Sequence, residues 1–163
     1  MKAGTIDKDT LADRAPYIAG LLDGEGTFTI VWNRRARRLN FRPLIMVLMT
    51  HPGVIIHIAE TFQVTFDVRR TKKRKSYKLA VTTKDDIVTI LEALIPHLIV
   101  KKENAEIILE LVDLKERGEL TPEIADDMAQ LYLRIRQLNT KGPAFNYDEL
   151  KSTLERHIED YFK

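Results

Sequence analysis

A short segment near the start of the chain constrains its fold more than any other part. It reads Pro16-Tyr-Ile-Ala-Gly-Leu-Leu-Asp-Gly-Glu-Gly-Thr27, in which apolar residues lead to an acidic residue, Glu25, that stands between two glycines. Asp13 can cap a helix here, Pro16 suits its first turn, and the two glycines provide the flexible backbone with which a helix ends abruptly. We therefore predict a helix that ends near Glu25 and carries this carboxylate at its terminus.

Small residues mark one side of this predicted helix. Gly20 and Gly24 lie four residues apart on one face, and Ala19 is next to them, so another backbone could approach closely there. Each glycine costs about 1 kcal/mol relative to alanine in a helix, so some contact must compensate. The alternative interpretation is an ordinary core helix that ends in glycine and is followed by an acidic turn residue.

The nine residues from Ile18 to Gly26, Ile-Ala-Gly-Leu-Leu-Asp-Gly-Glu-Gly, resemble the signature of the LAGLIDADG homing endonucleases. This resemblance implies an α+β fold, with an αββαββα core over about residues 13–117, an antiparallel DNA-binding sheet and additional C-terminal helices. It also implies an intron-encoded, site-specific endonuclease that cleaves both strands of DNA by metal-dependent hydrolysis.

The family packs two signature helices against each other, and this chain has one copy of the signature. The resemblance therefore implies a homodimer with two-fold symmetry and a long, near-palindromic double-stranded DNA target. The residues expected at the dimer interface all lie on the signature helix: Ile18, Ala19, Gly20, Leu21 and Gly24.

The resemblance also implies an active site. Glu25 takes the place of the acidic residue that binds a divalent cation, with Mg²⁺ expected, and Gly24 lends its backbone carbonyl. His51 follows Thr50 where the family places a polar residue, and it could position the attacking water; a structural histidine is the alternative. Lys101 matches a lysine near the metal, or else it is an ordinary surface lysine at a helix start. An arginine that assists in relatives falls near Ile55 here.

Composition sets further limits. With 163 residues and 44% hydrophobic content, we expect a single domain over 1–163, with a helical extension over about 118–163. Cysteine is absent, which excludes disulfides and thiolate metal sites. No apolar stretch reaches the roughly 18 residues of a membrane span, so we expect a soluble intracellular protein that does not bind a membrane. We also expect no small-molecule cofactor. His57 and Glu60 have helical spacing that could hold a metal, but a solvated helix face is the preferred interpretation.

Charge is distributed unevenly along the chain. The net charge is only +2, yet twelve basic and two acidic residues lie between Arg34 and Lys78, whereas residues 101–163 hold ten basic and fourteen acidic residues. A single run of charged residues usually forms a solvated loop. Here two basic runs fall at two predicted hairpin turns. We interpret the middle of the chain as a surface that binds a polyanion.

Alternating apolar residues predict four strands, over 27–33, 39–50, 64–70 and 75–83. Helices are predicted over 52–62, from 84 to 94, from 101 or 102, from 121 and over about 150–161. Strand parity and the two basic turns give the candidate DNA-binding residues: Thr29, Asn33, Arg34, Arg35, Arg37, Arg38, Arg42, Arg69, Arg70, Lys72, Lys73, Arg74, Lys75, Ser76 and Lys78. The same parity turns Val31, Leu44, Met46 and Leu48 outward, either to contact thymine methyls or to be covered on both faces.

Two other functions remain open at this stage. One is a nucleic-acid binder that keeps the fold without cleavage, such as an RNA-splicing maturase or a repressor-like DNA binder. The other is a structural dimerisation module, which would not need twelve basic residues at two hairpins.

Overall fold

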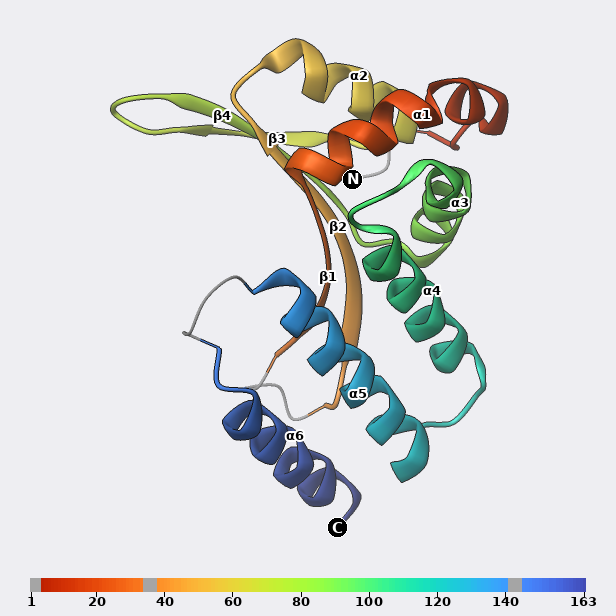
Figure 1. The fold of residues 1–163 in the computed structure, drawn as a ribbon, viewed down its shortest axis with the longest axis vertical. Helices are drawn as coiled ribbons and strands as arrows, with labels where there is room; N and C mark the ends of the chain where they lie inside the picture. Colours follow the sequence, from red (N-terminus) through yellow and green to blue (C-terminus); the bar gives the residue numbers. More distant parts are fainter. Residues whose placement is uncertain (1–3, 34–37, 141–144) are drawn as a thin grey trace. The chain divides into compact units, whose positions relative to one another are not determined.

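The computed structural model describes residues 4–33, 38–140 and 145–163. The elements in chain order are α1 (Lys8–Glu25), β1 (Gly26–Trp32), β2 (Phe41–Met49), α2 (Pro52–Phe62), β3 (Phe66–Arg70), β4 (Lys75–Val81), α3 (Lys84–Leu94), the 3-10 helix η1 (Ile95–His97), α4 (Lys102–Glu116), α5 (Pro122–Asn139) and α6 (Tyr147–Phe162) (Figure 1). The predicted αββαββα order with additional C-terminal helices is confirmed.

The four strands form one sheet in the order β1-β2-β4-β3. β2 and β3 both run antiparallel to β4, with Val47 opposite Leu79 and Val68 opposite Tyr77. Buried and more exposed residues alternate along β1 and β2, as the sequence predicted. Register is specified by this alternation, because a slip of one residue would turn every apolar side chain to the wrong face.

The chain divides into two compact units. Unit 1 comprises residues up to 28 and residues 44–105, and unit 2 comprises residues 29–43 and 106–163. β1, β2 and α4 each begin in one unit and end in the other. Each unit is therefore built from segments that are distant in sequence, and the predicted boundary near residue 117 does not coincide with the division between units.

In unit 1, α1 packs against α2, α3 and η1. Fully buried side chains at these contacts include Leu22, Ile58 and Ile90, which come from three different helices. Burial of each such side chain contributes about 1.5–3 kcal/mol relative to exposure. The helix that carries the signature is thus held by the apolar core, and its last residue is fixed in position by that packing.

α1 begins earlier than we predicted. Asp7, rather than Asp13, is the cap, since its carboxylate accepts hydrogen bonds from the backbone N–H groups of Asp9 and Thr10 at 3.3 Å each. Pro16 lies inside the helix instead of in its first turn. Pro16 and Ala12 are both exposed, so water can bind the Ala12 carbonyl that loses its helical partner.

α1 runs directly into β1 at Gly26, which Figure 1 shows as a continuous passage from helix to strand. The backbone of Gly26 is extended, so the expected use of a flexible glycine conformation is wrong at this position. Space is the reason for the glycine, because a Cβ atom would lie 2.8 Å from the carbonyl oxygen of Leu22.

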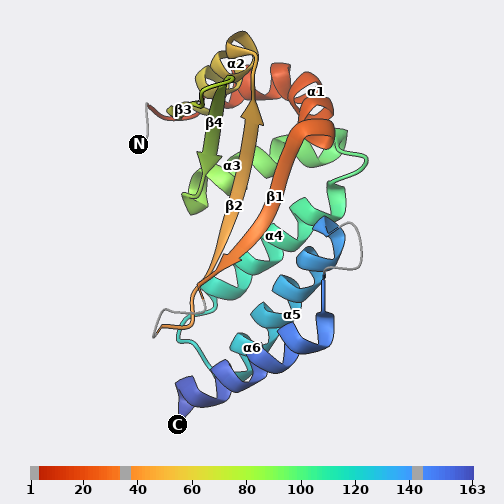
Figure 2. The ribbon, with the colours of Figure 1, turned by 90° about the vertical axis from the view of Figure 1, so that its left-hand side faces the viewer.

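In unit 2, α5 and α6 lie side by side (Figure 2). Aromatic rings gather beside them: the Trp32 ring lies 6.2 Å from Phe41, 5.8 Å from Tyr132 and 5.3 Å from His157, measured between centroids. Such pairs add about 0.5–1.5 kcal/mol each beyond area burial. The C-terminal helices thus complete the core around the far ends of β1 and β2.

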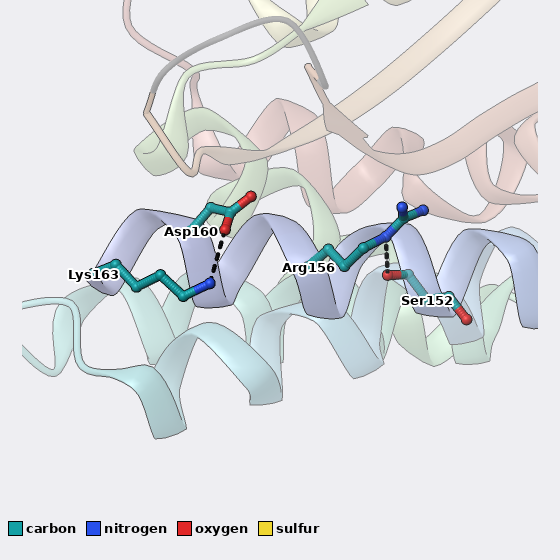
Figure 3. A network of polar contacts seen from close by, with 4 residues as sticks. All are labelled: Ser152, Arg156, Asp160 and Lys163. Carbon is teal, nitrogen blue, oxygen red and sulfur yellow. Dashed lines mark hydrogen bonds and ion pairs between the residues drawn. The ribbon is translucent and has the colours of Figure 1, made fainter.

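The exposed side of α6 carries polar contacts. Figure 3 shows Arg156 donating to the backbone oxygen of Ser152 at 3.3 Å and Lys163 lying 3.1 Å from the carboxylate of Asp160. Exposed pairs of this kind contribute little stability.

Among the described residues, no helix is long and apolar enough to cross a membrane.

One predicted burial is wrong. The alternation over 64–70 predicts that Phe66 and Val68 face inward, but the Val68 side chain is 47% exposed. β3 is an edge strand of the sheet, and an edge strand has a neighbour on one side only. Phe66, on the same strand, is half-buried and packs against Tyr77 with ring centroids 6.0 Å apart.

Candidate functional site

Glu25, the last residue of α1, is exposed and lines an open hollow of about 320 Å³ within unit 1. The remaining walls come from the end of β2, the residue after it, and the β3–β4 hairpin: Leu48, Met49, Thr50, Arg74 and Ser76. The hollow therefore combines a carboxylate, a guanidinium and two hydroxyls around a space that could accept a phosphate group.

The basic tip predicted between β3 and β4 is a tied turn. Thr71 donates its backbone N–H to the Arg74 carbonyl at 2.9 Å, and the Thr71 hydroxyl accepts the Arg74 N–H at 3.1 Å. Lys72 and Lys73 stand exposed between them. The turn thus fixes the backbone from which the Arg74 side chain reaches the hollow, whereas the two lysines do not line it.

Two residues before Glu25, Asp23 binds a loop that is distant in sequence. Its carboxylate accepts the backbone N–H of Ile99 at 2.8 Å and that of Lys101 at 2.9 Å. The Lys101 ammonium also donates to the backbone carbonyl of Asp23. The structure therefore brings Lys101 to the end of α1, the helix whose last residue is Glu25.

Partial burial acts to raise the pKa of the Asp23 carboxyl, but the backbone N–H groups of Ile99, Lys101 and Val100, together with the Lys101 ammonium, outweigh it. The net result is a pKa below the ordinary value of an aspartate. Asp23 is therefore ionised at neutral pH, and it supplies two acceptor oxygens to the loop. Sequence reasoning missed this contact, because nothing in either segment marks the other as its partner.

His51 is exposed at the N-cap position of α2, and its side chain makes no capping hydrogen bond. Its neighbour Thr50 lines the hollow, but His51 itself does not. Ile55, the position near which the family resemblance places an arginine, is fully buried. A cation at the hollow therefore comes from the hairpin, through Arg74, rather than from α2.

His57 and Glu60 do not gather further metal ligands. No group of three or more histidine, cysteine or acidic side chains within metal-binding reach occurs among residues 4–33, 38–140 and 145–163. The His57 ring instead packs edge-on against Tyr17 at 5.6 Å. This contact joins α2 to α1.

The predicted interface residues on α1 divide into two sets. Gly20 and Gly24 are exposed, and a Cβ atom added at either would meet nothing within 4 Å. Ile18 and Ala19 are fully buried inside unit 1, so their side chains offer no surface to a second copy, and that part of the prediction is wrong. The helix face available to a partner is the glycine face, with Leu21 half-buried beside it.

One face of the sheet in unit 1 carries three of the candidate DNA-binding residues, Arg69, Ser76 and Lys78, whereas Arg70 and Lys75 lie on the other face. Lys78 lies between Leu48 and Asp67, to both of which it is directly opposite, and Arg69 is opposite Ser76. Asp67 places a negative charge beside Lys78, a feature that strand parity could have revealed. Leu48 is 48% exposed, so this strand is not covered on both faces at that end.

In unit 2, Arg42 and Asn33 are exposed and Thr29 and Val31 are half-buried. Burial lowers the pKa of Lys115, and the nearby positive charge of Arg42 lowers it further. Arg38, Arg70, Lys72, Lys73 and Lys75 are exposed. Arg34, Arg35 and Arg37 lie outside the described residues.

The fold is similar to those of crystallised homing endonucleases. I-CvuI, in complex with the I-CreI target, has a TM-score of 0.71 and 17% identity over 90% of this chain and 96% of its own. The archaeal intron-encoded I-Vdi141I, complexed with DNA, has a TM-score of 0.68 and 18% identity over 93% of this chain and 98% of its own. I-TnaI has a TM-score of 0.65 and 22% identity over 94% of this chain and 99% of its own.

This chain also matches about half of the LAGLIDADG homing endonuclease I-GzeII, with 91% of its own residues, 49% of that chain and a TM-score of 0.61. No protein-family model matches the chain, and a search of curated proteins gives no match either. The chain therefore has the LAGLIDADG homing endonuclease fold, and the predicted fold class is confirmed.

Proposed function

We propose that this protein is a site-specific endonuclease that cleaves both strands of double-stranded DNA as a homodimer. The observation that carries the proposal is the position of Glu25, an exposed carboxylate at the end of the signature helix, in a hollow shared with Arg74. The fold supports it, since the similar structures of I-CvuI and I-Vdi141I are DNA complexes.

Glu25 and the backbone carbonyl of Gly24 are the groups that would hold a divalent cation. One carboxylate per chain fits Mg²⁺, which keeps several waters and takes further ligands from substrate phosphates. When bound, such an ion neutralises charge on a phosphate and lowers the pKa of a bound water. The structures of I-CvuI obtained with magnesium and with calcium agree with this choice of ion.

In the proposed reaction, a water oxygen forms a bond to phosphorus while the bond from phosphorus to the 3′ oxygen breaks. The proton lost by the water passes to solvent, and the leaving oxygen gains one. Lys101, held at the end of α1, supplies positive charge near the phosphate, and His51, which follows Thr50 in the chain, orients water. Arg74 provides a second cation from the β3–β4 hairpin.

The homodimer follows from the need for two such sites, one for each DNA strand. The open glycine face of α1 supports it, because Gly20 and Gly24 permit close approach of a second backbone. Ile99 and Val100, in the loop bound by Asp23, are 86% and 72% exposed and extend the apolar surface next to the end of α1. Burial in a dimer would explain why such side chains are exposed in one chain.

The test begins with selection of cleaved duplexes from a library of randomised half-sites arranged as inverted repeats, in the presence of Mg²⁺. We expect a near-palindromic site, and we expect Glu25→Gln to bind it with unchanged affinity and to cleave it at less than about one-thousandth of the wild-type rate. Glu60→Gln, a change at an exposed glutamate on α2, is the control. Selection that yields no cleaved duplex with the wild-type protein, or cleavage by Glu25→Gln at the wild-type rate, would refute the proposal.

A further inference from the structure

The contact between Asp23 and residues 99–101 joins two elements that the chain separates widely. Asp23 lies in the last turn of α1, and Lys101 immediately precedes α4. The contact uses both parts of the aspartate, because the carboxylate binds the loop backbone and the main-chain carbonyl binds the Lys101 ammonium. Asp23 therefore fixes both the backbone and the side-chain end of Lys101.

The location of these hydrogen bonds gives them a second consequence. Helix geometry places the Asp23 carbonyl one turn or less from Glu25, so a lysine that binds it stands at a set position relative to that carboxylate. A lysine elsewhere on the surface would sample many rotamers, which costs up to about 2 kcal/mol when the side chain is ordered. Here the ordering is already present in the free protein.

We propose that Asp23 is a positioning residue that presets the Lys101 ammonium relative to Glu25 before DNA binds. This inference rests on the proposed function of Glu25 and Lys101. Asp23 itself does not contact the phosphate, because its carboxylate oxygens accept from Ile99 and Lys101. Its contribution reaches the reaction through Lys101 alone.

Asp23→Asn tests the role of the carboxylate with little change of shape. An amide offers one acceptor oxygen and one donor group, so only one of the two backbone N–H groups keeps its partner, and the loop loosens. On the duplex cleaved by the wild type, at saturating protein and well below the melting temperature, we expect the single-turnover rate to fall about 10- to 100-fold. Asp9→Asn, which removes an exposed carboxylate in the first turn of the same helix, should leave the rate unchanged.

A double-mutant cycle separates positioning from general support of the fold. Lys101→Met removes the ammonium and keeps the length of the side chain. If Asp23 acts through Lys101, adding Asp23→Asn to Lys101→Met should change the rate less than about twofold. Multiplied losses in the double variant, or a wild-type rate for Asp23→Asn, would overturn the inference while leaving the endonuclease proposal intact.

Asp23→Glu provides the test if the asparagine variant does not fold. It keeps both acceptor oxygens but displaces them by one methylene, so we expect the loop to stay bound and the rate to fall at least threefold through misplacement of Lys101. A wild-type rate for Asp23→Glu would show that position does not matter and would contradict the inference. Absence of cleavage by the wild-type protein itself would refute the endonuclease proposal first, and this inference with it.

Discussion

Lys101 in unit 1 and Lys115 in unit 2 make the same kind of hydrogen bond in different surroundings. Each ammonium donates to a backbone carbonyl, that of Asp23 in one case and that of Phe41, at 2.7 Å, in the other. The Lys101 ammonium lies near the carboxylate of Asp23. The carbonyl that it binds belongs to Asp23, which precedes Glu25 by two residues. Lys115 is in an environment where burial and Arg42 lower its pKa.

The hollows of the two units also differ. Lys115 lines a smaller one of about 160 Å³, whose other walls are mostly apolar side chains such as Leu39, Leu114 and Met128. The hollow at Glu25 has charged and hydroxyl groups on its walls. The comparison teaches that a lysine bound to a carbonyl is a candidate for chemistry where that carbonyl belongs to the helix end that carries Glu25, and that elsewhere it serves packing.

The largest effect that distinguishes the two units concerns assembly. Gly20→Leu places a large side chain on the open face of α1, and we expect it to abolish the homodimer, because close approach of two backbones is then blocked. Ser152→Leu, on the exposed face of α6 in unit 2, should leave the dimer unchanged. Sedimentation at micromolar concentration measures both, and a wild-type protein that sediments as a monomer would contradict this expectation.

The two lysines themselves give the next largest effect. We expect Lys101→Met to slow cleavage about 100-fold at saturating DNA, because a cation near the phosphate is lost. Lys115→Met should leave the cleavage rate unchanged. It should lower the free energy of unfolding by about 1 kcal/mol, because the lost hydrogen bond to Phe41 is only partly offset by relief of repulsion with Arg42. Single-turnover kinetics and thermal melting measure the two quantities, and equal losses of rate would remove the distinction drawn here.

A smaller difference separates base contacts from phosphate contacts. Arg42→Ala, in unit 2, should relax sequence preference at one base pair of each half-site, at a cost of roughly 1–3 kcal/mol. Lys73→Ala, at the hairpin tip of unit 1, should weaken binding to all sequences and reduce the salt slope by about one. Binding measured with the selected duplex and with random DNA checks both, and equal losses on the two DNAs for Arg42→Ala would argue against base contact.

The smallest expected effect is on the start of α1. The hydrogen bond from the Thr10 hydroxyl, followed by the backbone N–H groups of Asp9 and Thr10, outweighs desolvation and lowers the pKa of the Asp7 carboxyl. A carboxyl whose pKa is lowered by folding stabilises the protein at any pH above its ordinary pKa. This stabilisation is lost as the pH falls through the pKa of the folded state. The difference in melting temperature between the wild type and Asp7→Ala should therefore shrink in acid below pH of about 4. A difference that stays constant down to pH 2 would exclude this role.

Local patterns in the sequence were sufficient for the order of elements and for the faces of β1 and β2. α2 has the predicted bounds, Pro52 to Phe62, because a proline at its start and a helical apolar spacing both act within a few residues. The basic turn at Thr71 to Arg74 was likewise predictable from a short run of cations. Pro16 misled the prediction, since its preference for a first turn is outweighed by an exposed setting in which the missing hydrogen bond costs little.

The sequence by itself determined that a carboxylate, Glu25, stands at the end of a helix with an open glycine face, because helix periodicity and the signature residues are local. Only the tertiary structure decided that Ile18 and Ala19 turn inward, that Arg74 reaches the hollow of Glu25, and that Asp23 holds Lys101. These contacts join residues far apart in the chain. Their partners are selected by how the elements pack against each other, and no spacing within a single segment records that choice.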